Sequence, residues 1–288
     1  MEIRKNTCID TNKEELPKFS VLMTVYKQET PSFLNRSLES LELQTILPNK
    51  IIIVADGPLT SELDAIIEKH QKRQGDRIKL IRLPKNKGRG YASKIGIDVV
   101  ETEWVARMDS DDVSLPDRFE KQLKAIKKHP EVSVIGSYVS EFEDDEDVII
   151  GQRKVPITNK EIKDYARYRN PINNPSVMFK ASAVQAIGGY PQINILEDYD
   201  LWISFIANDY QLMNLDESLV KMRVGSGMYS RRGGIKFLIL YIQMKSKWRK
   251  LGVGNKKTEI VSDIVMTVNT LMPNFFRRLI YRKMIHKK

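Results

Sequence analysis

The first two thirds of the chain alternate between short apolar runs and longer segments with helical spacing of apolar residues. Four runs predict strands, at residues 19–26, 50–57, 78–83 and 104–108. The segments between them, at residues 31–44, 61–73 and 90–100, predict helices, and Ser32 is placed to cap the first. The run "KIIIVADG" is continuous, as in strands buried on both faces of a parallel sheet. We therefore expect an α/β fold with a mostly parallel sheet flanked by helices.

The pattern changes after about Pro130. Residues 132–142 and 148–155 predict two strands joined by the acidic turn "EDDED", which we interpret as the solvated tip of a hairpin. Helices are expected near residues 160–168 and from the stretch "ILEDYDLWISFIA". From Arg231 onward the chain is helical and amphipathic in pattern.

Composition narrows the classes of protein. Hydrophobic residues make up 41% of the chain, which allows a substantial core. Cys8 is the single cysteine and the three histidines are scattered, so an internal disulfide is excluded and a Cys/His zinc site has little support. The polar N-terminus lacks a signal-peptide core, and no apolar run approaches the roughly 20 residues of a membrane span. We expect a cytoplasmic protein.

The net charge of +10 is unevenly distributed. Residues 231–288 contain 15 Lys and Arg but two acids, a net charge of +13, while the remaining 32 basic and 35 acidic residues sum to −3. This basic tail predicts a polyanionic partner, either anionic lipid headgroups or nucleic acid. The alternative is a solvated charged helix.

Polar residues gather where the predicted parallel strands end. Because ligands bind beyond the carboxyl ends of such strands, we expect a site at this edge. The residues concerned are Thr24 and Tyr26, Asp56, residues 84–88 and residues 109–112.

The stretch "DSDD" places Asp109, Asp111 and Asp112 directly after a predicted strand. Hard divalent cations such as Mg²⁺ and Mn²⁺ prefer oxygen ligands and often share their shell with a substrate diphosphate. We expect Asp109 and Asp111 to bind such a cation together with the substrate diphosphate. Asp112 or Ser114 could instead cap the following helix.

A second acidic pair, Glu197 and Asp198, begins the predicted helix in "LEDYDLW". Acids at a helix N-terminus favour its dipole without any catalytic role. Beside a metal and nucleotide site the pair becomes a candidate for catalysis, because a transferase needs a general base and no histidine is well placed to serve.

Taken together, these residues resemble the inverting glycosyltransferases of family 2, which have the GT-A fold. The resemblance covers roughly residues 19–224 and rests on an ordered set of motifs: "SVLMTVY", "VADG", "NKGRGYASKIGI", "ARMDSDD", "NPS" with "GGY", and "EDYDLW". It implies an N-terminal extension (residues 1–18), a GT-A catalytic domain (19–230) and a basic amphipathic helical tail (231–288).

The resemblance also implies roles in donor binding. Thr24 and Tyr26 would line a uracil pocket, and Asp56 would accept the uracil N3–H. Residues 87–90, which include Lys87 and Gly88, would border the nucleotide, where glycine permits close approach of the backbone.

The remaining site residues would act on the sugar, the metal and the acceptor. Arg107 would lie near the base or the donor sugar, and Asp109 would contact ribose or metal-bound water. Asp111 would bind Mn²⁺ or Mg²⁺. Asp198 would deprotonate the acceptor hydroxyl, with Glu197 contacting the acceptor or supporting that base.

The implied reaction moves galactose or glucose from a UDP-sugar to N-acetylglucosamine or N-acetylgalactosamine on diphosphoundecaprenol, with a β-linkage. Such enzymes act in O-antigen or capsular polysaccharide synthesis. Arg223, Arg231 and Arg232 could add positive charge near the leaving group. The tail would then bind the anionic inner face of the cell membrane rather than nucleic acid.

Three alternatives stay open at this stage. A different nucleotide-sugar or a later repeat-unit acceptor fits the same motifs. The stretch "DSDDV" formally fits the nucleophile motif of haloacid dehalogenase-type phosphohydrolases, although three strand–helix units precede it. The basic tail alone would suit a nucleic-acid-binding protein, but the body lacks a recognisable recognition module.

Overall fold

The computed structural model describes residues 16–225 and 234–272. The strands are β1 (Phe19–Val25), β2 (Lys50–Ala55), β3 (Ile78–Arg82), β4 (Trp104–Asp109), β5 (Val113–Ser114), β6 (Val132–Phe142), β7 (Gly151–Arg153), β8 (Met178–Lys180) and β9 (Gln211–Arg223). The α-helices are α1 (Pro31–Glu42), α2 (Ser61–Gln74), α3 (Arg89–Asp98), α4 (Arg118–Lys128), α5 (Asn159–Ala166), α6 (Ala181–Ala186), α7 (Glu197–Ala207), α9 (Ile235–Lys250) and α10 (Lys256–Leu271). Two 3₁₀ turns, η1 (Gly75–Arg77) and η2 (Asn174–Ser176), complete the described elements.

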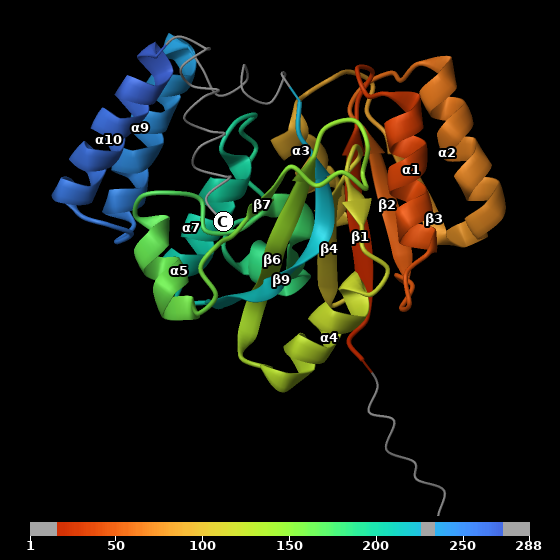
Figure 1. Cartoon of the computed structure of the whole chain (residues 1–288), viewed down its shortest axis with the longest axis horizontal. Helices are drawn as coiled ribbons and strands as arrows, with labels where there is room; N and C mark the ends of the chain where they lie inside the picture. The colour runs from red at the N-terminus through yellow and green to blue at the C-terminus, as the bar shows by residue number, and fades with distance from the viewer. Residues whose placement is uncertain (1–15, 226–233, 273–288) are drawn as a thin grey trace, which may run out of the picture.

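One sheet with the strand order β3-β2-β1-β4-β8-β6-β9-β5 runs through the centre of the molecule, and β7 pairs with β6 (Figure 1). β1 pairs in parallel with β2 and β4, and β2 with β3. Beyond β4 the sheet is mixed, because β8 runs antiparallel to both β4 and β6. The predicted α/β sheet is confirmed. Its first four predicted strands form one parallel block, and beyond them β6 pairs in parallel with β9.

Side chains that alternate along the parallel strands fill two cores, one on each face of the sheet. Leu22 and Ile52 face a core with α3, α6 and α7, whereas Val21 and Ile51 face one with α1, α2 and α4. Burial on both faces explains why these strands are continuous apolar runs in the sequence.

Two predicted helix caps are wrong. α1 begins at Pro31, whose fixed φ suits the first turn, so Ser32 lies inside the helix and Thr30 occupies the cap position. α4 begins at Arg118 after Asp117, so neither Asp112 nor Ser114 caps it. Ser114 lies in β5 instead.

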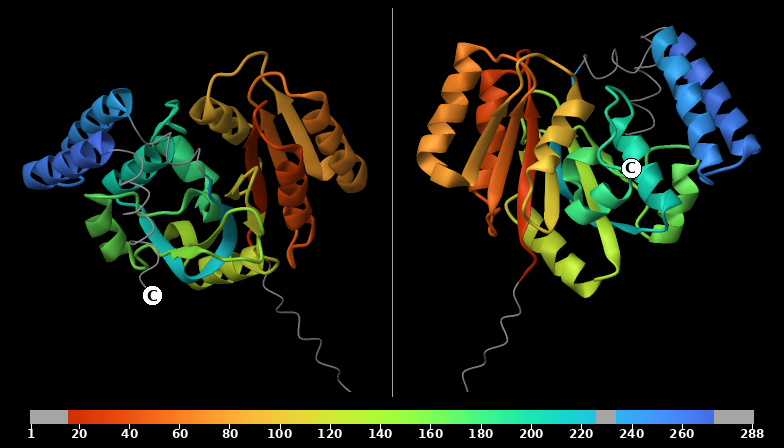
Figure 2. Two further views of the ribbon diagram at one scale, coloured as in Figure 1. Left: turned by 45° about the horizontal axis from the view of Figure 1, so that its top comes forward. Right: turned by 180° about the vertical axis from the view of Figure 1, so that it is seen from behind.

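The C-terminal part forms an antiparallel pair of helices, α9 and α10, at the outer edge of the molecule in every view (Figures 1 and 2). The helical extension is thus confirmed within the described residues. Residues 1–15, Cys8 among them, and Arg231, Arg232 and residues 273–288 lie outside the described parts. Within residues 16–225 and 234–272, no helix is both long enough and apolar enough to cross a membrane.

Candidate active site

The carboxyl ends of β1, β2 and β4 meet at one edge of the sheet, as predicted. Thr24 of β1 is the register partner of Asp109 at the end of β4. The backbone N–H of Asp56 donates to the carbonyl of Val25 at 2.8 Å. Tyr26 follows β1 and is 37% exposed, so its ring is available at this edge.

Asp56 is buried and holds the loop that precedes α3. Its carboxylate accepts the backbone N–H groups of Lys87 at 2.7 Å and Gly88 at 2.9 Å. Gly88 has φ of +92°, and a Cβ there would lie 1.6 Å from Oδ1 of Asn194. A glycine is therefore required where the loop of Asn194 closes on the start of α3.

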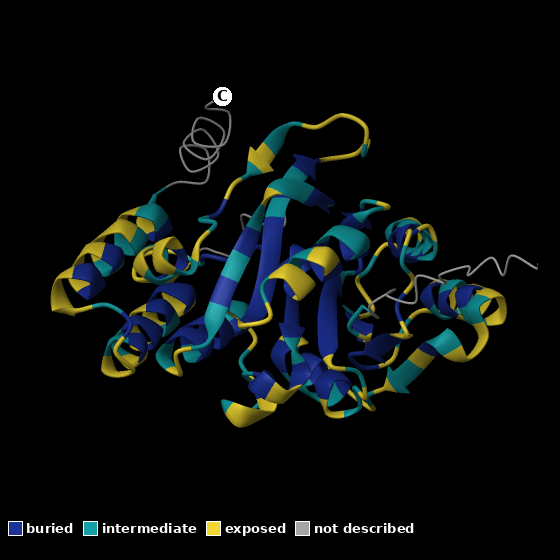
Figure 3. Cartoon of the chain, turned by 90° about the horizontal axis from the view of Figure 1, so that it is seen from below, coloured by how far each residue is buried: buried dark blue, intermediate teal, exposed yellow. Residues whose placement is uncertain are grey.

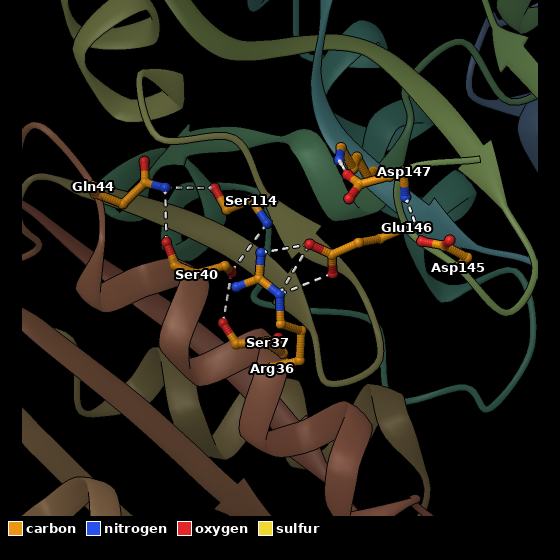
Figure 4. Close-up of polar contacts among 9 residues, drawn as sticks. Arg36, Ser37, Ser40, Gln44, Ser114, Asp145, Glu146 and Asp147 are labelled. Carbon is orange, nitrogen blue, oxygen red and sulfur yellow. Dashed lines mark hydrogen bonds and ion pairs between the residues drawn. The ribbon is translucent and has the colours of Figure 1, made fainter. Parts of the chain in front are cut away.

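Three polar side chains hold the backbone around the "DSDD" loop: Ser37 and Ser40 on α1, and Gln44 just after the end of that helix (Figure 4). The Ser37 hydroxyl donates to the Asp109 carbonyl at 3.1 Å, and Ser40 Oγ accepts the Ser114 N–H at 3.1 Å. Gln44 Nε2 donates to Ser114 Oγ at 3.2 Å. The carboxylates of this loop are thus held by rigid backbone on both sides.

The acidic turn after β6 is the exposed tip of a hairpin, as predicted, and it is tied back to the body. Arg36 of α1 donates to both carboxylate oxygens of Glu146, with distances from 2.6 to 3.1 Å (Figure 4). Lys221 pairs with Asp147 at 3.0 Å. These contacts place the hairpin beside the N-terminal half of α1.

Arg223, at the end of β9, supports the aspartate loop from the other side. Its guanidinium lies 3.7 Å from the ring centroid of Phe33 and 4.4 Å from that of Phe142. It donates to the Asp111 carbonyl at 3.3 Å, and its backbone N–H donates to the Asp112 carboxylate at 2.8 Å. Asp112 is buried and structural. The Arg223 guanidinium donates to one backbone carbonyl of this loop and to two in the hairpin after β6, and its role beside the leaving group stays a prediction.

Negative charge accumulates at Asp109 and Asp111. Burial, followed by the charges of Asp109 and Glu29, raises the pKa of Asp111 to about 6. The Ser110 hydroxyl donates to Glu29, which brings that third carboxylate to the loop. Burial and the neighbouring carboxylates thus disfavour the ionised form of Asp111, which a bound cation would favour.

These residues fit a divalent cation held by Asp109 and Asp111. Both offer carboxylate oxygens at the end of a buried strand, the ligand type that Mg²⁺ and Mn²⁺ prefer. Among the described residues, no group of three or more histidine, cysteine or acidic side chains is arranged to hold a metal. The remaining ligands would therefore come from water and a substrate phosphate, which is common for these ions.

Arg89, the first residue of α3, lies between the two acidic clusters. Its Nη1 is 3.9 Å from Asp109 Oδ2, and its Nε is 4.0 Å from Glu197 Oε1. Asp109 first, and then Glu197, raise the pKa of Arg89. The sequence indicated residues 87–90 as a nucleotide-bordering stretch but did not single out Arg89. The sequence signal that could have identified Arg89 is its position between two glycines at the start of a predicted helix.

Arg107 lies beneath Asp109 and is fully buried. Its Nη2 is 3.8 Å from Asp109 Oδ1, and its Nη1 donates to Ser93 at 3.2 Å. Arg118 donates to the Arg107 carbonyl at 2.8 Å, and burial lowers the pKa of Arg118 to about 9. This geometry suits Arg107 to orienting Asp109, and a direct contact with the donor stays a prediction.

The second acidic pair begins α7. Leu196 precedes it with φ of +66°, a strained conformation for a residue with a side chain. Asp198 accepts hydrogen bonds from Asn170 Nδ2 and the Tyr199 N–H, both at 2.8 Å. Glu197 is 5% exposed, and burial followed by the charge of Asp198 raises its pKa to about 7.

The C-terminal helices reach this pair through α9. Asp200 of α7 accepts hydrogen bonds from Lys247 at 2.8 and 2.9 Å and from Trp248 Nε1 at 2.7 Å. The Trp248 ring lies 4.2 Å from that of Tyr199. Sequence reasoning missed Asn170, Asp200 and these partners, because their contacts span 28 to 48 residues.

Comparison with known families decides the class of this protein. The model described as glycosyl transferase family 2 matches residues 20–186, more than half of the chain. The chain belongs to this family. It is a glycosyltransferase, as the motifs predicted, rather than a phosphohydrolase.

Relatives of this glycosyltransferase span more than nine tenths of its length. An uncharacterised glycosyltransferase of Haemophilus influenzae is 36% identical, with 94% of this chain and 100% of that protein covered. A UDP-Gal:alpha-D-GlcNAc-diphosphoundecaprenol beta-1,3-galactosyltransferase of Escherichia coli is 35% identical, covering 95% and 98%. The amylovoran biosynthesis glycosyltransferase AmsE of Erwinia amylovora is 34% identical, covering 92% and 98%.

Solved structures confirm the GT-A fold of the glycosyltransferase. Staphylococcus aureus TarS 1–349 in complex with UDP-GlcNAc aligns with a TM-score of 0.61 at 18% identity, over 90% of this chain and 69% of that one. The mannosyltransferase PcManGT of Pyrobaculum calidifontis, in complex with GDP-Man and Mn²⁺, gives 0.60 at 12% identity over 94% and 70%. At such identities the likeness concerns the fold alone.

Proposed function

We propose that this glycosyltransferase moves galactose or glucose from a UDP-hexose to an N-acetylhexosamine linked to a polyprenyl diphosphate. The observation that carries the proposal is that Arg89 lies between two acidic clusters and contacts both. One cluster is Asp109 with Asp111, and the other is Glu197 with Asp198. The E. coli relative named for UDP-Gal and GlcNAc-diphosphoundecaprenol, which aligns with 95% of this chain, supports the choice of donor and acceptor.

The donor would lie along the edge formed by β1, β2 and α3. Thr24 and Tyr26 would flank the uracil, and Asp56 would accept its N3–H with the lone pairs that Lys87 and Gly88 leave available. Lys87 and Gly88 would border the diphosphate. A divalent cation held by Asp111 and Asp109 would supply Lewis-acid charge at the departing UDP.

Asp198 would act as the general base. Its carboxylate is already oriented by Asn170 and the Tyr199 N–H, as a positioned base requires. The acceptor oxygen forms a bond to the anomeric carbon while its proton passes to Asp198, and the bond to UDP breaks on the opposite face. An α-linked donor therefore gives a β-linked product. Glu197 would hold the acceptor or support the base.

A lipid-linked acceptor implies work at the anionic inner face of the cell membrane. The described part of the tail supports this location through its charge, since residues 234–272 contain seven Lys and Arg against two acids. Polysaccharide synthesis, such as that of O-antigen, is the corresponding process.

A panel of UDP-Gal, UDP-Glc, UDP-GlcNAc and GDP-Man with synthetic GlcNAc- and GalNAc-diphospholipids tests the proposal. We expect a β-linked disaccharide from UDP-Gal or UDP-Glc, loss of product in EDTA and recovery with Mn²⁺. Asp198→Asn should lower kcat by about 10²- to 10⁴-fold, the usual contribution of a general base. Transfer from GDP-Man alone, or full activity in EDTA, would refute the donor or the metal assignment.

A further inference from the structure

Helix α10 has its polar side turned inward and its apolar side turned outward. Six aliphatic side chains spaced along one face of the helix are 42% to 71% exposed. They are Ile260, Val261, Ile264, Val265, Val268 and Leu271. Figure 3, in which the ribbon is coloured by burial, shows exposed stretches along this outer pair of helices. The buried residues of α10 are instead Thr258, Glu259, Ser262 and Thr270. We call the six aliphatic residues the α10 face.

Polar contacts on the inner side fix this orientation. Glu259 binds Arg249 at 2.6 Å and Lys256 at 3.2 Å. Asn255 and Thr258 form a capping box at the start of the helix. Rotating α10 to bury the aliphatic residues would break the bond from buried Glu259 to Arg249 of α9 and the 3.5 Å contact of Ser262 with the Arg167 carbonyl, which is costly. Outward exposure of the α10 face is therefore built into the hairpin.

Basic side chains lie at one end of the α10 face. Lys250, Lys256 and Lys257 are exposed around the turn between α9 and α10, close to Leu251, which is also exposed. Beyond α10, residues 273–288 add six Lys and Arg and no acid to the sequence. An aliphatic stripe with flanking cations matches the surface that an anionic bilayer presents, an acyl boundary beneath phosphate headgroups.

We propose that the α10 face inserts into the interface of an anionic bilayer, with the lysines of the α9–α10 turn at its headgroups. This deepens the proposed function, because a lipid-linked acceptor must be reached at a membrane. A second copy of the chain fits the face less well, since pairing two such hairpins would bring their positive charges together.

The docked hairpin is joined rigidly to the active site. α9 packs between α10 and α7, and its Lys247 and Trp248 bind Asp200, two residues beyond Asp198. The bilayer contact thus fixes the orientation of the acceptor base relative to the membrane surface.

Flotation of the full-length protein with vesicles of phosphatidylcholine containing 30% phosphatidylglycerol tests the proposal. The variant Ile264→Gln/Val265→Gln/Val268→Gln should lower the partition coefficient roughly 10- to 100-fold, because it removes three partly exposed aliphatic side chains from the membrane contact. Lys250→Gln/Lys257→Gln should also weaken binding to these vesicles. The matched control Leu43→Gln/Val148→Gln/Ile149→Gln changes three exposed aliphatic residues elsewhere and should bind as wild type.

Four outcomes would overturn the proposal. Wild type could fail to bind the anionic vesicles, or the α10 variant could bind as tightly as wild type. Light scattering could instead show a dimer that the same exchange dissociates, which would assign the face to a second copy. If deletion of residues 273–288 abolished vesicle binding while the α10 variant still bound, binding would belong to residues 273–288. Transfer to a short-chain, water-soluble acceptor should be unchanged in the α10 variant, so a failure of docking is distinguishable from a failure of the proposed function.

Discussion

We predict that the buried carboxyl group of Glu197 makes the protein less stable at alkaline pH, where this group is ionised. Glutamate titrates near 4.3 in unfolded chains, whereas burial and then Asp198 raise the folded pKa of Glu197 to about 7. The folded state therefore holds this proton more tightly than the unfolded state. Its contribution to stability is full below pH about 4.3 and is lost as the pH rises through about 7.

The size of the effect follows from the two pKa values. Each pH unit between them is worth about 1.4 kcal/mol, so ionised Glu197 destabilises the protein by roughly 3 kcal/mol at pH 8. Glutamine has the same shape and no charge. Without metal or donor, Glu197→Gln should raise the free energy of unfolding by up to roughly 3 kcal/mol at pH 8 and by about 1 kcal/mol at pH 5. The transferase activity of this variant should fall, because active-site residues commonly serve function at a cost in stability.

Urea denaturation followed by tryptophan fluorescence at both pH values measures this difference. Glu68→Gln is the control, since Glu68 is exposed on α2, and it should change stability little at either pH. The reasoning fails if Glu197→Gln is less stable than wild type at pH 8, or if it gains the same free energy of unfolding at pH 5 and pH 8. Either result would show that folding does not raise the pKa of Glu197.

Three further changes test other parts of the site. Asp111→Asn should lower kcat/KM by about 100-fold or more, and a Mn²⁺ titration of the rate should not restore it. Arg89→Gln removes a half-exposed cation worth about 1 kcal/mol, so Mn²⁺ without donor should bind several-fold more tightly by calorimetry while kcat/KM falls. Asp200→Asn weakens the bonds to Lys247 and Trp248 and should cost roughly 2 kcal/mol in urea denaturation, with a larger fall in kcat than rise in KM.

The edge of the sheet that holds the site could be predicted from sequence because its geometry is regular. Parallel strands in register bring their carboxyl ends together, so Thr24, Asp56 and Asp109 had to lie near one another once the strands were recognised. The apolar runs that predict those strands are long and buried on both faces. No long-range information was needed for this part of the site.

The roles within the "DSDD" loop could not be predicted in the same way. Asp112 takes its hydrogen bond from Arg223, 111 residues later in the chain. A local view offered a helix cap, a common role for aspartate before a helix. The burial of Arg107 was equally hidden, because an arginine in a strand gives no local sign that Asp109 and Ser93 will enclose it.

The two C-terminal helices show why an amphipathic pattern does not by itself say which side faces the protein. On α9 the aromatic side faces inward, where Phe237 and Trp248 are buried against the body. On α10 the polar side faces inward, because Glu259 meets Arg249 and Ser262 lies 3.5 Å from the Arg167 carbonyl, 95 residues away. Periodicity is the same in both cases, and only these partners decide which stripe is left for a membrane to bind.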